Sequence, residues 1–172
     1  GNGIIEKDMT LAISDYMYDR FRELGLPVKM IRTTDETISP TERVNRVLDA
    51  FGNNRDVLVI SNHINAGGGE GAEVIYALRN NSELPDLVLE ELGKEGQKIR
   101  KAYQRRLPSD TSKDYYFMQR NTGITQPITV EYGFLDNAAD AQKLKNNYID
   151  YAEAVVRAVL QYIGYTEGGE NT

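Results

Sequence analysis

The one histidine of the sequence lies where chemistry is expected. His63 follows the apolar run 57–60, and the polar residues Ser61, Asn62 and Asn65 surround it before a run of glycines. Apolar, mostly β-branched residues in an unbroken run predict a strand that is buried on both faces, in the centre of a helix-covered sheet. Ligands bind at the carboxyl ends of strands in open α/β sheets. His63 is therefore a candidate catalytic or metal-binding residue, the alternative being a structural histidine that hydrogen-bonds a carbonyl group.

Two carboxylates could work with this imidazole. Glu131 stands in the otherwise apolar strand 128–132, where an acidic residue is uncommon unless it is paired or functional. Its alternative role is that of a polar residue on the exposed face of an edge strand. Glu6 precedes a helix predicted over 7–24, and a carboxylate there is also explained by the free N–H groups and the macrodipole of a helix start.

The elements that must position these residues alternate along the chain. A helix over 7–24 and a strand over 27–32 precede a second helix, which begins at the capping sequence Ser39-Pro40-Thr41-Glu42. The pattern further predicts strands at 57–60, 72–78, 115–120 and 128–132 and helices at 84–107, 137–144 and 148–163. Helices and strands in alternation imply an α/β fold with a mostly parallel central sheet flanked by helices.

Composition limits the classes of function. The 172 residues suit a single domain, which we assign to residues 1–165, with a linker or tail at 166–172. A net charge of −6 argues against nucleic-acid binding. No apolar run approaches the roughly 18 residues of a membrane span. The chain has no cysteine, so the redox compartment stays open, and no signal peptide is visible at Gly1.

Four segments together resemble the catalytic domain of zinc-dependent N-acetylmuramoyl-L-alanine amidases, bacterial cell-wall hydrolases that include endolysins. Their order and spacing over most of the chain make the resemblance specific. The segments are Gly3-Ile-Ile-Glu-Lys-Asp8, Arg32-Thr-Thr-Asp35 with Thr41-Glu-Arg43 after it, Ser61-Asn-His-Ile-Asn-Ala66, and Val130-Glu-Tyr-Gly-Phe-Leu-Asp-Asn137.

The resemblance implies specific roles for these residues. Glu6 and His63 match two zinc ligands of the family, and Glu131 matches its catalytic carboxylate. The implied reaction is hydrolysis of the amide between N-acetylmuramic acid and L-alanine of the peptidoglycan stem peptide, by zinc-activated water with Glu131 as general base. Asn65 and Arg120 are candidates for substrate or supporting contacts, or for simple loop hydrogen bonds.

One family feature has no counterpart here. The first zinc ligand of the family is a histidine in a Gly-His-Gly-Gly turn after an opening strand, and we expect the chain as given to lack both. The resemblance implies action outside the cell at the cell wall, by a host enzyme, a spore enzyme or a phage lysin, and a possible wall-binding module beyond residue 172. Two alternatives remain: a non-catalytic relative that binds peptidoglycan or a partner after losing the metal, and another metal-dependent amide hydrolase.

Overall fold

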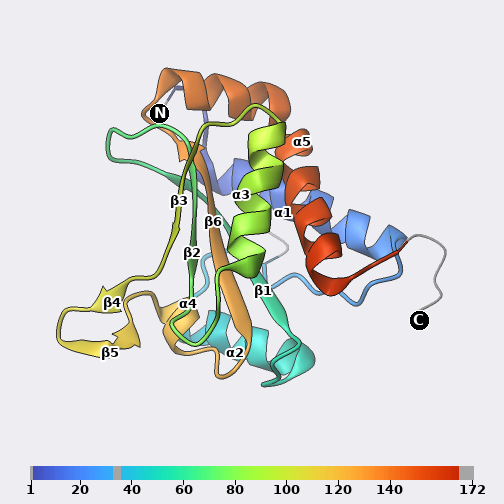
Figure 1. The fold of residues 1–172 in the computed structure, drawn as a ribbon, viewed down its shortest axis with the longest axis vertical. Coiled ribbons are helices and arrows are strands. Elements are labelled where there is room, and N and C mark those ends of the chain that lie inside the picture. The colour runs from blue at the N-terminus through green and yellow to red at the C-terminus, as the bar shows by residue number, and fades with distance from the viewer. Residues whose placement is uncertain (1, 33–35, 167–172) are drawn as a thin grey trace.

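A computed structural model describes residues 2–32 and 36–166. The helices and strands have the following bounds: α1 Glu6–Glu23, α2 Pro40–Phe51, β1 Leu58–Asn65, β2 Ala72–Tyr76, α3 Glu83–Lys94, β3 Ile99–Tyr103, β4 Arg106–Leu107, β5 Asp110–Asp114, α4 Phe117–Arg120, β6 Gln126–Phe134 and α5 Ala138–Ile163. The fold is a single α/β domain whose central sheet is mostly parallel and flanked by helices (Figure 1). The predicted fold class is confirmed.

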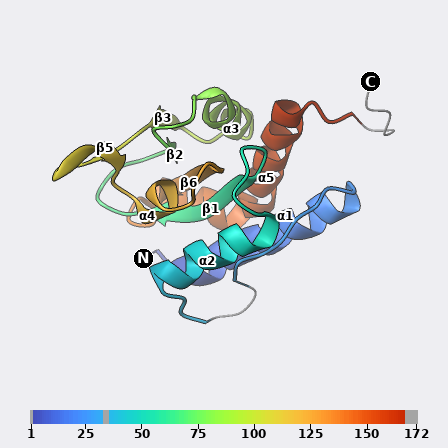
Figure 2. The same cartoon turned by 90° about the horizontal axis from the view of Figure 1, so that it is seen from below.

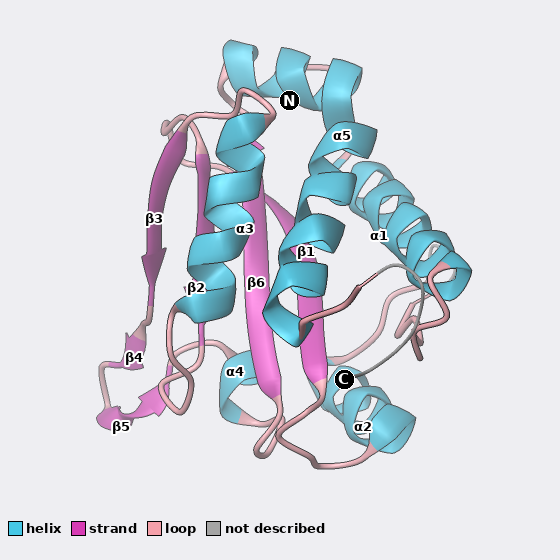
Figure 3. Cartoon of the chain, turned by 45° about the vertical axis from the view of Figure 1, so that its right-hand side comes forward, coloured by secondary structure: helices cyan, strands magenta, loops and turns pink. Residues whose placement is uncertain are grey.

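The main sheet has four strands in the order β1-β6-β2-β3. β1 pairs in parallel with β6, β2 pairs in parallel with β3, and the central pair β2 and β6 is antiparallel. The short strands β4 and β5 form a separate hairpin beyond β3 (Figure 3). Because β1 and β6 run in the same direction, their carboxyl ends meet at one edge of the sheet.

The two faces of the sheet are covered differently. Even-numbered residues such as Val74, Val130 and Tyr132 are fully buried in the main core beneath α3 and α5. On the opposite face, Gln119 of α4 donates hydrogen bonds to the Thr129 hydroxyl and the Ile75 carbonyl. Figure 2 shows α3 and α2 on opposite sides of the sheet. On this face α4 packs near the amino end of β6, whereas His63 and Glu131, near the carboxyl ends of β1 and β6, are only partly buried.

Local signals fixed several helix boundaries as predicted. The Ser39 hydroxyl accepts a hydrogen bond from the Glu42 N–H at 3.2 Å, with Pro40 at the first helical position. The predicted helix over 7–24 is α1. The two helices predicted at the end of the chain are joined as α5, whose backbone leaves helical geometry at Asn147. The strands predicted at 72–78 and 128–132 correspond to β2 and β6.

The predictions for residues 84–107 and 115–120 were wrong in extent and in kind, respectively. The helix predicted over 84–107 ends as α3 at Lys94, because Gly96 adopts a positive φ of 89°, and the chain then forms β3 against β2. The segment 115–120, predicted as a strand from its aromatic residues, contains the single helical turn α4. Tertiary pairing with β2 overrode the helical periodicity in the first case.

The expected central strand at 57–60 lies instead at an edge. Within the described residues β1 pairs only with β6, and Leu58 and Ile60 are half-buried. Residues 27–32 were predicted as a strand, yet they join no ladder in the part of the chain that the structure describes. An isolated extended segment has no partner for its backbone groups, and pairing is what makes a strand.

Some predictions fall outside the described residues. Thr33, Thr34 and Asp35 of the second resemblance segment lie there, as does most of the expected tail at 166–172. No helix in the described ranges is long and apolar enough to cross a membrane.

Candidate active site

Three acidic or imidazole side chains form a row across the sheet. His63 of β1 is the register partner of Glu131 of β6, and Glu131 is the register partner of Glu73 of β2. Residues directly opposite each other in a sheet project from the same face. The three side chains therefore share one face at the carboxyl ends of β1 and β6, away from the α3 and α5 layer.

Glu6 joins this row from the first turn of α1. Its Oε1 lies 3.8 Å from His63 Nδ1, and the two side chains are 42% and 41% exposed. The same Oε1 accepts a hydrogen bond from the Ile64 N–H at 3.3 Å, which faces the open edge of β1. The His63 imidazole and the Ile64 N–H outweigh burial and lower the pKa of Glu6. Glu6 is thus an ionised carboxylate beside the imidazole, and both are reachable from solvent.

Glu131 occupies a different environment from Glu6. It is half-buried, and its Oε2 is a buried oxygen with no hydrogen-bond partner in the described chain. Burial raises the pKa of Glu131 to about 7; His63 lowers it, and the charges of Glu6 and Glu73 raise it further. A carboxyl group with a pKa near neutrality can take up and release a proton at physiological pH.

Glu73 is a site residue that the sequence analysis missed. It is 5% exposed, and its Oε1 accepts hydrogen bonds from Asn65 Nδ2 at 2.9 Å and from the Tyr103 hydroxyl at 3.4 Å. The candidate residue Asn65 is therefore joined to the row through Glu73. The signal that identified Glu131, an acidic residue in an apolar strand, is equally present in the segment 72–76.

Two aspartates fasten the glycine-rich loop beside the site. Asp136 Oδ2 accepts hydrogen bonds from the N–H groups of Gly67 and Gly68 at 3.0 and 2.8 Å. The fully buried Asp140 accepts from the N–H groups of Gly71 and Phe134, both at 2.8 Å. These charge-assisted bonds hold the loop between β1 and β2 against the end of β6.

Arg120 is not brought to this row. It ends α4, ahead of the amino end of β6, and its Nη1 donates to the carbonyl groups of Asp114 and Tyr115.

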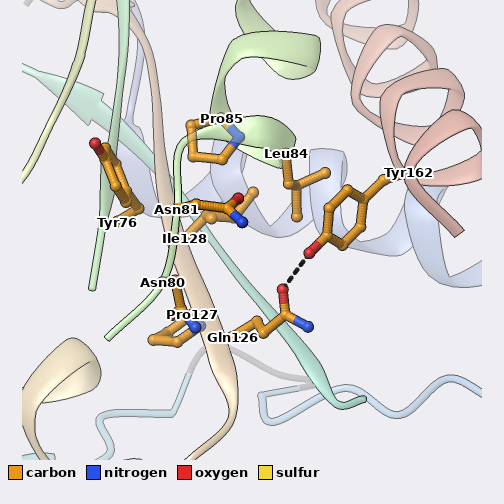
Figure 4. A pocket seen from close by; sticks show the side chains of 9 residues that line it. All are labelled: Tyr76, Asn80, Asn81, Leu84, Pro85, Gln126, Pro127, Ile128 and Tyr162. Atoms are coloured by element: carbon orange, nitrogen blue, oxygen red, sulfur yellow. Dashed lines mark hydrogen bonds between the residues drawn. The ribbon is translucent and has the colours of Figure 1, made fainter. Parts of the chain in front are cut away.

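A small pocket also lies away from the site. It is lined by Tyr76, Asn80, Asn81, Leu84, Pro85, Gln126, Pro127, Ile128 and Tyr162 (Figure 4). The Tyr162 hydroxyl donates to Gln126 Oε1 across it at 2.6 Å. None of the candidate residues lines this pocket. The candidate site is therefore the group of candidate residues at the carboxyl ends of β1 and β6.

Glu6 and His63 fit zinc in the kind of donor they offer. A carboxylate oxygen and an imidazole nitrogen are both zinc ligands, and a catalytic site uses three protein ligands. Within residues 2–32 and 36–166, however, no group of three His, Cys, Asp or Glu side chains is arranged to hold a metal ion. The pair is thus one ligand short of a catalytic zinc site.

Comparison with known proteins decides the family. A family model described as N-acetylmuramoyl-L-alanine amidase matches residues 1–161. The chain belongs to this family. An amidase from Bacillus licheniformis, CwlM, is 31% identical over 153 residues, covering 85% of this chain and 54% of the relative. An uncharacterised Bacillus subtilis protein, YqiI, is 28% identical over 167 residues, covering 94% of this chain and 76% of the relative.

Several solved structures of similar fold are amidases. Cwp6 from Clostridium difficile superposes with a TM-score of 0.82 at 25% identity, covering 93% of this chain and 26% of that one. The catalytic domain of CwlV, an amidase from Bacillus (Paenibacillus) polymyxa, superposes with a TM-score of 0.79 at 18% identity, covering 95% and 88%. Family membership makes amidase activity on peptidoglycan the class of function for this chain.

Proposed function

We propose that this chain hydrolyses the amide bond between N-acetylmuramic acid and the L-alanine of the stem peptide, with zinc as cofactor and Glu131 as general base. The observation that carries the proposal is the meeting of Glu6, His63 and Glu131 at the carboxyl end of a parallel strand pair. Membership of the amidase family supports the substrate class. Action at the cell wall, outside the membrane, follows from that substrate.

Each residue has a defined task in this proposal. Glu6 and His63 would hold the zinc ion, together with a third ligand that the described residues do not supply. Zinc, when bound, would polarise the scissile carbonyl group and make water more acidic. Glu131 takes a proton from the attacking water and returns it to the leaving amine, because it stands directly opposite His63 on the same face of the sheet. Asn65, held by Glu73, would orient the substrate beside the row.

The test is release of a new alanine amino terminus from purified muropeptides in the presence of zinc. Glu131→Ala should lower the rate about 10²- to 10⁴-fold, the usual contribution of a general base. The matched control is Glu90→Ala, which removes a carboxylate from an exposed position of α3 and should leave the rate unchanged. A wild-type rate in Glu131→Ala would remove Glu131 from this role.

Because the described residues supply no third zinc ligand, non-catalytic binding of peptidoglycan is a second candidate function. A relative that binds peptidoglycan without cleaving it needs no third donor, and the described residues hold only two beside each other. Zinc content and muropeptide release separate the two functions. A pure binder would sediment with insoluble peptidoglycan, bind zinc below one ion per chain and release no alanine amino terminus.

A further inference from the structure

Arg100 stands at an irregular position of the sheet next to the site. Ile99 of β3 is opposite Ala72, but Lys101 is already opposite Glu73, so Arg100 is one extra residue in β3. Such a β-bulge redirects side chains, and bulges are frequent beside active sites. Here the bulge brings the Arg100 side chain to Glu73, where its Nε lies 3.3 Å from Glu73 Oε2.

The guanidinium group of Arg100 is held on several sides. Its central carbon lies 5.0 Å from the centroid of the Phe134 ring. A methyl group at Gly69 would overlap both Arg100 Nη1 and the Phe134 ring, so the absence of a side chain there makes room for the guanidinium. The side chain is nevertheless 37% exposed. Arg100 is therefore positioned by its neighbours while still open to solvent.

Most of the hydrogen-bonding capacity of Arg100 is unused. Neither Nη group donates a hydrogen bond to any residue in 2–32 or 36–166. Glu73 does not depend on Arg100 alone, because Asn65 and Tyr103 donate to its other oxygen. A planar guanidinium with free Nη groups is suited to bidentate binding of a carboxylate. The site thus presents a preformed anion-binding group on its β2 and β3 side.

The Arg100 guanidinium lies at the distance from Glu131 that the second residue of a bound stem peptide would reach. Glu73 is directly opposite Glu131, and neighbouring strands are about 4.8 Å apart. An extended peptide advances about 3.3 to 3.6 Å per residue. A stem peptide whose amide bond lies at Glu131, and which runs toward β3, therefore brings its second residue near the Arg100 guanidinium.

We propose that Arg100 binds the free α-carboxylate of the residue that follows L-alanine in the stem peptide, and so selects stem peptides in which this carboxyl group is not amidated. This inference rests on the proposed function, since it uses the placement of the scissile amide at Glu131. Beyond that function, it specifies which form of the substrate the site prefers.

The test compares two muramyl tripeptides, MurNAc-L-Ala-γ-D-Glu-L-Lys and its analogue with the D-glutamate α-carboxyl amidated. Their dissociation constants are measured by NMR titration on the metal-free protein, so that binding is read without hydrolysis. The wild type should bind the free acid about tenfold more tightly, the lower range for a charge-assisted hydrogen bond. Arg100→Gln should bind both peptides equally.

Two further variants test whether the preference comes from a specific contact with Arg100, and not from a change in net charge or in folding. Gly69→Ala keeps every charge but displaces the guanidinium, and it should also lose the preference. Lys101→Gln removes a cation from the next residue, whose Nζ lies over the Tyr103 ring, and it should keep the preference. A wild type without acid preference, a preference that persists in Arg100→Gln, or an equal loss in Lys101→Gln would each overturn the inference. Muropeptide release by the wild type, assayed separately, reports on the proposed function itself.

Discussion

Glu131 should make the metal-free protein less stable as the pH rises. Its carboxyl pKa is raised from 4.5 to about 7 in the folded chain, so between these values the folded state binds more protons than the unfolded state. The free energy of unfolding therefore falls with rising pH over this window. The full difference, about 2.5 pKa units at 1.36 kcal/mol each, is about 3 kcal/mol. Glu131→Gln, which cannot ionise, should escape this loss.

The assay is urea unfolding of wild type and Glu131→Gln between pH 4 and 8.5 with a chelator present. The stability difference in favour of the variant should grow by about 2 kcal/mol between pH 4 and pH 6, and by about 3 kcal/mol by pH 8. Glu90→Gln, at an exposed position of α3, controls for removal of a carboxylate elsewhere. A difference between the wild type and Glu131→Gln that does not change with pH would refute the reasoning, because it would mean that ionising the buried carboxyl does not destabilise the fold.

Other outcomes follow from single contacts. His63→Ala, which removes one of the two proposed zinc donors, should weaken zinc binding at least about tenfold in a chelator competition. Unchanged zinc affinity would remove His63 from the proposed metal site. Asp140→Ala leaves two buried N–H groups without an acceptor and should cost about 3 kcal/mol in urea unfolding, whereas a cost below about 1 kcal/mol would contradict the anchoring role. Burial raises the pKa of Glu91, but Lys94 and the neighbouring groups of α5 outweigh it and lower the pKa to about 2. Glu91 therefore stabilises the fold above pH 4.5 and loses this contribution as the pH falls toward 2. Glu91→Gln should therefore lose less unfolding free energy than the wild type between pH 4.5 and 2. An equally steep loss in the variant and the wild type would exclude this contribution of Glu91.

Sequence alone determined the helix boundaries that are set by residues close together in the sequence. The capping sequence at Ser39 set the start of α2, and Gly25, which adopts a positive φ of 75°, set the end of α1, because these signals act within one helical turn. Alternation of helices and strands gave the fold class. An imidazole and two carboxylates in family-like segments identified Glu6, His63 and Glu131 as candidates, and these three are neighbours in the folded chain.

Only the tertiary structure decided what depends on pairing between distant segments. The sequence pattern of β1 suits a central strand, yet β1 lies at an edge of the described sheet because pairing is a property of two strands. The helical periodicity after Lys94 gave way to strand pairing with β2. The register between β2 and β6 places Glu73 opposite Glu131. The bulge in β3 then places Arg100 beside Glu73. Register and bulges are set by contacts between strands far apart in the sequence, so no local pattern of residues encodes them.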